Sequence, residues 1–311
     1  MTRIAAIAPV LPEHSYSQAE ITAAIAPLLA PDPKRRPLVE RMYASSTVER
    51  RYSALPLEQY QHLGSLTETN AAWFAAAVEL GERAVREALE KSGIGVDEVD
   101  LLLFTSVTGV SAPSVDAVIA ERLGMRTDLR RWPSFGLGCV AGATGLARVN
   151  DYLEPRPTGV AVLLGDDHPK ATGPRIAATR SALIPGTSDV LAFNLTTTGF
   201  EIELTAEVAG VIERAFPAEV EALLQGRALP NAIVAHPGGP RILEAFATAL
   251  DLPRSRFERS WASLAAKGNL SSASVLHVLA DTLDAGEQNA LLFAVGPGVT
   301  TELVLLEAVD A

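Results

Sequence analysis

The chain has 311 residues, a net charge of −11 at pH 7 and a sequence pI near 5.0; 48% of its residues are hydrophobic, enough for a large core. The acidic balance excludes nucleic acid as the main partner, because proteins that bind nucleic acid present basic surfaces. No apolar run is long enough to cross a membrane, and the apolar run at the start is too short for a signal peptide. With one cysteine and no export signal, the chain is predicted to be cytoplasmic.

The first half of the chain is expected to alternate helices and strands. A long amphipathic helix is predicted from Thr69 or Asn70, either of which can cap it, to Ser92, with Gly93 as its stop. Val99–Val107 is a continuous apolar run, which is typical of a strand covered on both faces. The other elements expected here are a strand at 1–10, a helix at 17–30, a loop at 31–37, a helix at 114–123, a loop at 130–133, a helix at 141–153 and a strand at 159–165.

The second half repeats the same alternation. The order long helix, buried strand, polar turn, helix occurs around residues 70–123 and again around 207–250, which indicates a duplicated α/β unit. Because no long linker interrupts the chain, two tightly packed halves are predicted, residues 1–165 and 166–311. The expected elements of the second half are strands at 175–184, 200–204, 232–235, 290–295 and 301–307, and helices at 207–225, 241–250 and 271–283.

Cys139 is the only cysteine, and it stands where an extended segment is expected to turn into a helix. Backbone N–H groups and the positive end of a helix dipole stabilise a thiolate there, and the glycines around it let a substrate carbonyl approach. A lone thiol is also often a buried structural residue. The local pattern therefore leaves two interpretations open, a nucleophile and a core cysteine.

Two further polar residues stand at the ends of expected elements, His236 after a strand and Asn269 before a helix. Active sites of α/β folds are built from loops at strand ends, and a thiol nucleophile needs a partner such as imidazole. The Asn269 amide and His236 Nε2–H are suited to hold an oxyanion or enolate. Each residue also has an interpretation without a catalytic role, since His236 fits a turn and asparagine often caps helices.

Other polar clusters give weaker signals. Asp166, Asp167 and His168 are adjacent in a proline loop and cannot all point at one ion, so no metal site is predicted. His277 falls at an apolar helical position and is expected to be a satisfied core histidine. The basic residues near position 50 have two interpretations: they bind a phosphate, or they are simply exposed to solvent without a ligand.

Four segments, in this order, resemble the signatures of type III polyketide synthases, the chalcone-synthase-like enzymes of the thiolase superfamily. The segments are Phe135–Ala143, His236–Pro240, Gly268–Ser274 and Gly296–Gly298, and the resemblance covers nearly the whole chain. Pro237-Gly238-Gly239 separates the chain from the related ketoacyl synthase III enzymes, which have Gln-Ala-Asn after the histidine.

The resemblance implies an α/β fold, a thiolase-like layered αβαβα arrangement of two duplicated halves packed together. It implies that Cys139, from the first half, and His236 and Asn269, from the second, converge on one buried cavity. Cys139 would accept an acyl group from a starter acyl-CoA, with His236 keeping it as thiolate. His236 and Asn269 would stabilise the enolate from decarboxylated malonyl-CoA, which attacks the bound thioester in a decarboxylative Claisen condensation.

The same resemblance implies an acyltransferase of secondary metabolite biosynthesis that forms a homodimer and needs no metal or organic cofactor. Arg50 and Arg51 are the nearest candidates to bind the CoA phosphates, because Glu49 occupies one place where a basic residue is expected.

The sequence departs from the family after Leu164, where the resemblance implies an internal deletion the size of a strand–helix–strand segment. Such a segment normally supplies a central strand and part of the cavity wall, so its loss would expose apolar surface. Ala112, Ile202 and Val295 also differ from the usual residues and indicate a differently shaped cavity. A second hypothesis follows: a truncated, catalytically impaired homologue that acts as a dimer partner or acyl-CoA-binding scaffold. The complete Cys139, His236 and Asn269 set favours the enzyme.

Overall fold

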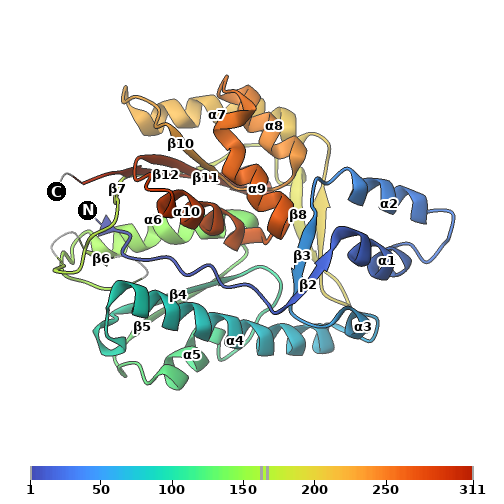
Figure 1. Cartoon of the computed structure of the whole chain (residues 1–311), viewed down its shortest axis with the longest axis horizontal. Helices are drawn as coiled ribbons and strands as arrows, with labels where there is room; N and C mark the ends of the chain where they lie inside the picture. The colour runs from blue at the N-terminus through green and yellow to red at the C-terminus, as the bar shows by residue number, and fades with distance from the viewer. Residues whose placement is uncertain (1, 162–163, 166–167, 310–311) are drawn as a thin grey trace.

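The structure is a computed structural model, and it describes residues 2–161, 164–165 and 168–309. Helices and strands alternate in layers from top to bottom of Figure 1, in the order helices, sheet, helices, sheet, helices. The layers are α7 (Val208–Leu224) and α8 (Pro240–Ala249); the main sheet; α6 (Ala141–Leu153) and α10 (Ser274–Asp284); β4 (Leu101–Ser106) and β5 (Arg130–Phe135); and α4 (Leu66–Ser92) and α5 (Val115–Leu123). This arrangement confirms the layered α/β fold.

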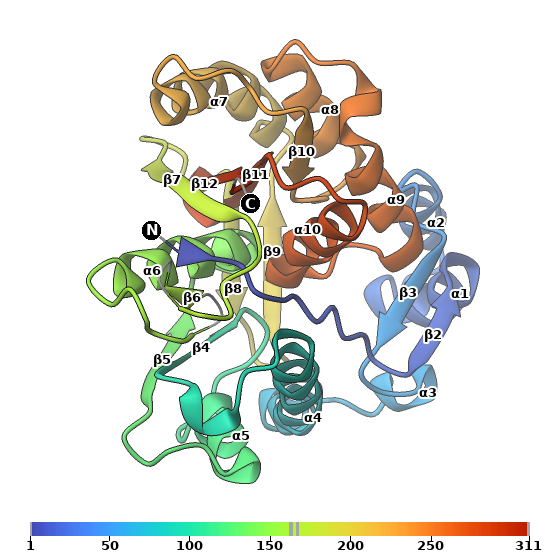
Figure 2. The same cartoon turned by 60° about the vertical axis from the view of Figure 1, so that its left-hand side comes forward.

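The main sheet has the strand order β10-β11-β12-β7-β1-β6. Its strands are β10 (Ala232–Ala235), β11 (Ala290–Gly296), β12 (Thr300–Glu307), β7 (Arg175–Leu183), β1 (Thr2–Arg3) and β6 (Leu164–Gly165). β10 runs parallel to β11, whereas β11, β12 and β7 pair antiparallel. Every residue of β10 and β11 is buried, because helices cover both faces there (Figure 2). The strands predicted at 232–235 and 290–295 are therefore confirmed as β10 and β11.

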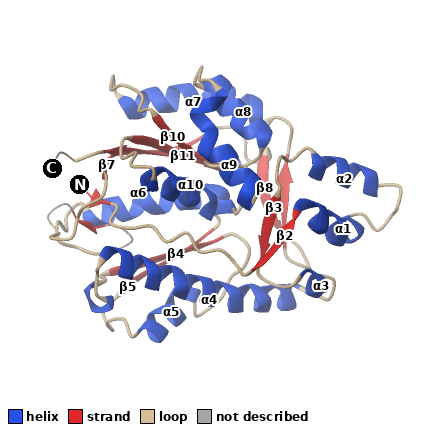
Figure 3. Cartoon of the chain, viewed as in Figure 1, coloured by secondary structure: helices blue, strands red, loops and turns tan. Residues whose placement is uncertain are grey.

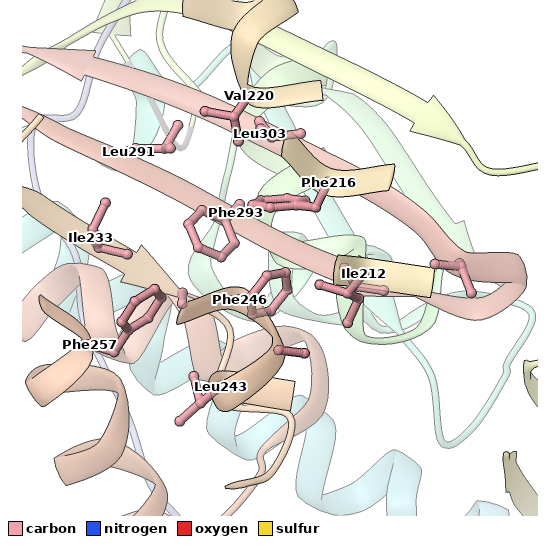
Figure 4. Packing of buried hydrophobic residues seen from close by; sticks show 14 of the residues in the cluster. Ile212, Phe216, Val220, Ile233, Leu243, Phe246, Phe257, Leu291, Phe293 and Leu303 are labelled. Atoms are coloured by element: carbon pink, nitrogen blue, oxygen red, sulfur yellow. The ribbon is translucent and has the colours of Figure 1, made fainter. Parts of the chain in front are cut away.

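The largest core lies between this sheet and the outer helices (Figure 4). Phe216, Phe246 and Phe293 form a ring cluster with centroid separations of 4.7 to 4.9 Å, tilted or edge to face. All three are at most 1% exposed. Each fully buried phenylalanine contributes roughly 1.5–3 kcal/mol through burial, and ring pairs add about 0.5–1.5 kcal/mol.

Among the described residues, the second sheet consists of the parallel pair β4 and β5. The loop expected at residues 130–133 was wrong, because this segment is the start of β5. Pro133 is tolerated there since β5 is an edge strand whose other side needs no donor. Four of the six residues of β5 are exposed, so this sheet is covered far less than the main one.

The long helix α4 ends as predicted, with Gly93 in the left-handed conformation at φ 67°. Its start differs from the prediction. Ser65 is the N-cap and accepts from Glu68 N–H, one turn before the expected Thr69 or Asn70. Thr69 instead donates to the Thr198 carbonyl, and Asn70 exchanges two hydrogen bonds with the backbone of Val110.

An N-terminal arm, blue in Figure 1, extends to one side of the layers. It contains β2 (His14–Ser17), α1 (Gln18–Leu29), α2 (Arg36–Ala44), β3 (Arg50–Ser53) and α3 (Leu57–Tyr60). The helix expected at 17–30 is confirmed as α1, whose capping box joins Ser17 and Glu20. The sequence did not predict α2.

Several boundaries differ from the sequence-based predictions; Figure 3 shows the helices and strands as the structure has them. The first strand is confined to β1, and only Leu164–Gly165 of the strand expected at 159–165 is a strand, with 162–163 outside the described residues. β8 (Leu191–Leu195), which pairs with β9 (Phe200–Leu204), and α9 (Glu258–Lys267) were not predicted. Within the described stretches 154–161, 164–165 and 168–174, no helix joins α6 to β7.

Two predicted absences concern membranes and metals. No described helix is long and apolar enough to cross a membrane. Across the described part of the chain, no group of three or more His, Cys, Asp and Glu is placed to hold a metal ion. Asp166 and Asp167 lie outside that part.

Candidate active site

Cys139 lies in a single 3-10 turn, η2 (Gly138–Val140), between the end of β5 and the start of α6. The expectation of an extended segment turning into a helix is therefore confirmed. The chain makes this turn through Gly136 at φ 91° and Gly138 at φ 58°, which side chains rarely allow. The thiol is partly exposed, and α6 presents its N-terminal backbone directly after it.

Glycines let three distant segments meet around this turn. A Cβ on Gly142 would overlap with the carbonyl oxygen of Ser272, and one on Gly138 would overlap with the Pro297 ring. A Cβ on Gly296 would lie 2.7 Å from the Leu137 carbonyl oxygen. The turn that carries Cys139 is thus packed against the segment after Asn269 and against the Gly296–Gly298 turn.

His236 follows β10 and is only 2% exposed. Its backbone N–H donates to the Phe293 carbonyl at 2.9 Å, which extends the pairing of β10 with β11. Neither ring nitrogen has a hydrogen-bond partner among the described residues, although buried polar atoms are nearly always paired. Burial lowers the pKa of His236 to about 4, so the ring is neutral at physiological pH.

Asn269 joins two of the segments through its side chain. Its Nδ2 donates to the Gly238 carbonyl at 3.1 Å, and its Oδ1 accepts from Ser271 N–H at 2.8 Å. Asn269 is exposed rather than enclosed. The expectation of one buried cavity was therefore wrong in this respect, since the carboxamide faces solvent while the imidazole is buried.

A chain of contacts links the three predicted residues. The Cys139 Sγ lies 3.4 Å from the Ser271 Oγ, Ser271 is bonded to Asn269, Asn269 to Gly238, and Gly238 N–H to the His236 carbonyl at 2.9 Å. Neither His236 nitrogen makes a hydrogen bond to the sulfur.

The electrostatics of Cys139 differ from the expectation based on its position before a helix. Burial raises the pKa of the Cys139 thiol, while the Ser271 hydroxyl and the backbone N–H of Cys139 act in the opposite direction. With His236 also held neutral by burial, the thiol and the imidazole are both uncharged at rest.

Ser271 is the residue at this site whose role the sequence did not indicate. Ser271 or Ser272 was expected to cap the following helix, but α10 begins only at Ser274. A second unpredicted feature is the β8–β9 hairpin beside the nucleophile turn. Phe193 of β8 would contact a Cβ on Gly138, and Phe200 of β9 packs against Phe135 with ring centroids 5.5 Å apart.

The two arginines proposed for CoA lie in different surroundings. Arg51 is half-buried; its Nε donates to Gln18 Oε1 at 2.7 Å, and its Nη1 would lie 3.1 Å from a Cβ on Gly268. Arg51 therefore lies beside the Asn269 loop. Arg50 is exposed and donates to Ser15 Oγ at 2.8 Å.

His277, expected in the core, is 4% exposed on α10. Its Nδ1 has no hydrogen-bond partner in the described structure, so the expectation that it is satisfied was wrong at that atom. Burial is the main cause that lowers the pKa of His277 to about 4, and Lys267 acts in the same direction.

The layered fold and the cysteine turn at the start of a central helix define a thiolase-like condensing enzyme. Residues 2–168 match the N-terminal domain of the chalcone and stilbene synthases, and residues 175–310 match the C-terminal domain. The chain belongs to this family of type III polyketide synthases, which transfer acyl groups in condensation reactions.

Named relatives and a solved structure agree with this assignment. The chain is 39% identical to a 1,3,6,8-tetrahydroxynaphthalene synthase of Streptomyces peucetius subsp. caesius over 350 positions, covering 98% of this chain and 93% of the relative. It is 27% identical to a phloroglucinol synthase of Pseudomonas fluorescens, covering 95% of this chain and 96% of that one. The crystal structure of 1,3,6,8-tetrahydroxynaphthalene synthase from Streptomyces coelicolor A3(2), a bacterial type III polyketide synthase, matches with a TM-score of 0.91 at 26% identity and covers 100% of both chains.

The alignment with the Streptomyces peucetius relative also bears on the expected deletion. It spans 350 positions, more than the 311 residues of this chain, so part of the relative has no counterpart here. The direct passage from β6 to β7 is the place where the sequence predicted the loss.

Proposed function

We propose that Cys139, His236 and Asn269 catalyse the decarboxylative Claisen condensation of this family, with a starter acyl-CoA and malonyl-CoA as substrates. The observation that carries the proposal is the buried His236 ring with two unpartnered nitrogens, joined through Asn269 and Ser271 to the thiol. Leaving such a ring unpaired costs about 1–3 kcal/mol, which a bound substrate would offset.

The first step is acyl transfer to sulfur. The neutral imidazole of His236 takes the Cys139 proton, and the thiolate attacks the thioester carbonyl of the starter. A new C–S bond forms as the C–S bond to CoA breaks, and the departing CoA thiolate takes up the proton. Because burial lowers the pKa of His236, the ring is neutral at physiological pH and has an unprotonated nitrogen that can take the proton.

The second step is decarboxylation of malonyl-CoA. The bond to the carboxylate breaks, CO2 leaves, and the electron pair moves onto the thioester as an enolate. The His236 N–H and the second N–H of the Asn269 amide, the one not given to Gly238, would hold the enolate oxygen. The enolate carbon then attacks acyl-Cys139, a C–C bond forms, and the cysteine leaves as thiolate.

The division of labour between residues 1–165 and 166–311 follows from the same proposal, with the nucleophile in the first part and the enolate site in the second. Arg51, beside the Asn269 loop, and Arg50, further out, are proposed to bind the CoA phosphates.

We also propose a homodimer. Its support is the exposed apolar surface at Leu183, Leu195, Ile202 and Leu204, each more than half exposed.

The decisive experiment combines malonyl-CoA with a panel of acyl-CoA starters and follows CO2 release and products by mass spectrometry. Wild-type protein is expected to release CO2 and form a pyrone or resorcinol-type product, and Cys139→Ala to lose condensation. His62→Gln, a change at an exposed histidine outside the site, is the matched control and should retain activity. A protein that binds malonyl-CoA without releasing CO2 would instead support the scaffold hypothesis.

A further inference from the structure

Ser271 is the one side chain that forms a hydrogen bond with the Cys139 sulfur among the residues that the structure describes, at 3.4 Å. Either atom is able to donate when the sulfur is a thiol. Once the sulfur is deprotonated, only the serine hydroxyl has a proton to give, so the contact must become an O–H donated to a thiolate. Such charge-assisted hydrogen bonds are about twice as strong as neutral ones.

The backbone of Ser271 is held in a conformation that serine seldom adopts. Its φ is 53°, in the left-handed region, which costs roughly 1–3 kcal/mol for a residue other than glycine. The Ser271 N–H donates to Asn269 Oδ1 at 2.8 Å, and Leu270 N–H donates to Ser274 Oγ at 2.6 Å. These bonds fix the turn, and glycine would fit it with less strain. A serine at this point therefore has a use for its hydroxyl group.

The surroundings of Cys139 indicate what that use is. Burial raises the pKa of the thiol, and the Ser271 hydroxyl is the foremost group that opposes this effect. His236, whose ring is unpartnered, makes no hydrogen bond to the sulfur. The nucleophile thus depends on a neighbouring donor to keep its charge after the proton has moved.

We propose that Ser271 is a positioning residue, whose hydroxyl donates a hydrogen bond to the Cys139 sulfur and stabilises the thiolate that attacks the acyl group. The proposal rests on the proposed function of Cys139 as the nucleophile. The proton of the thiol goes to His236, whereas the Ser271 hydroxyl keeps its own proton throughout. Because Asn269 holds the backbone of Ser271, Asn269 also supports this arrangement in addition to its role toward the enolate.

The test is the pH dependence of Cys139 alkylation by iodoacetamide, with no other cysteine present to react. Ser271→Gly removes the hydroxyl and suits the positive φ, and Ser271→Ala removes it while keeping a Cβ. Both are expected to raise the midpoint of the pH profile by about 1 to 2 pH units and to slow alkylation at pH 7 about 10- to 100-fold. Ser272→Ala, on the same turn, is the matched control and should leave the midpoint unchanged.

Turnover of malonyl-CoA by the same preparations separates the two proposals. If wild-type protein turns over and folded Ser271→Gly has an unaltered midpoint, the role of Ser271 is overturned and the proposed function stands. If the midpoint shifts as expected but wild-type protein releases no CO2, the proposed function fails while the role of Ser271 is supported. Far-UV circular dichroism checks that each variant is folded.

Discussion

Residues 175–310 and residues 2–168 build their sheets with very different coverage. In the first region β10 and β11 are buried along their whole length, and β12 is buried except at its two ends. In the second region β5 is the one strand that pairs with β4 among the described residues, and most of β5 is exposed.

The nucleophile turn is nevertheless well held, because α6 packs on both regions. Val140, Val149 and Leu153 are fully buried and share a cluster with Val304 of β12 and Val275 of α10. The other face of α6 contacts β4. The thicker region therefore supports the turn that carries Cys139 through its contacts with α6.

The largest expected effect comes from removing a ring from the thicker core. Phe216→Ala is expected to destabilise the protein by about 3–5 kcal/mol, because the ring is 1% exposed and packs against two other phenylalanines. Phe104→Ala, in the partly buried cluster of the thinner region, should cost less. Urea unfolding, followed by hydrogen exchange, measures the loss of unfolding free energy in both variants. Equal losses in the two variants would contradict the difference in burial between the two regions.

A pH effect is expected next, from the buried His277 on α10. Its folded pKa of about 4 lies below the value near 6.5 of an unfolded chain, so the folded state binds fewer protons between these values. The contribution of this histidine to the free energy of unfolding is therefore fully present above pH 6.5. It is lost as the pH falls toward 4, by up to about 3 kcal/mol.

The variant His277→Leu should reduce the fall in urea midpoint between pH 7.5 and pH 5. Exposed His62→Gln, the control, should leave that difference as it is in the wild type. The same loss of stability in His277→Leu as in the wild type would mean that other groups, His236 among them, account for the acid sensitivity.

The smallest of the three effects tests the contact between α6 and the Asn269 loop. Gly142→Ala is expected to cost about 1–3 kcal/mol and to slow Cys139 alkylation, because the new Cβ overlaps with the Ser272 carbonyl oxygen. Gly145→Ala, one turn on, meets only Leu103 at 3.4 Å and should keep wild-type reactivity. Alkylation of Gly142→Ala at the wild-type rate would show that the turn tolerates being pushed apart.

Much of this protein was predictable from local sequence. The strands predicted at 232–235, 290–295 and 301–307 are confirmed as β10, β11 and β12, and Gly93 marks the end of α4 as predicted, because burial and left-handed turns favour particular residue types. The motifs around Cys139, His236 and Asn269 indicated the family that the comparisons establish. The loop expected at 130–133 failed, since Arg130, Arg131 and Pro133 do not resemble a strand without β4 beside them.

By itself, the sequence determined the layered α/β class, the family and the identity of the three residues proposed for catalysis, because apolar periodicity and motif order are local properties of the chain. Only the tertiary structure decided that Ser271 contacts the Cys139 sulfur, that His236 is buried without a partner and that Asn269 faces solvent. The physical reason is that burial and hydrogen-bond pairing depend on groups far apart in the chain, which only folding brings together.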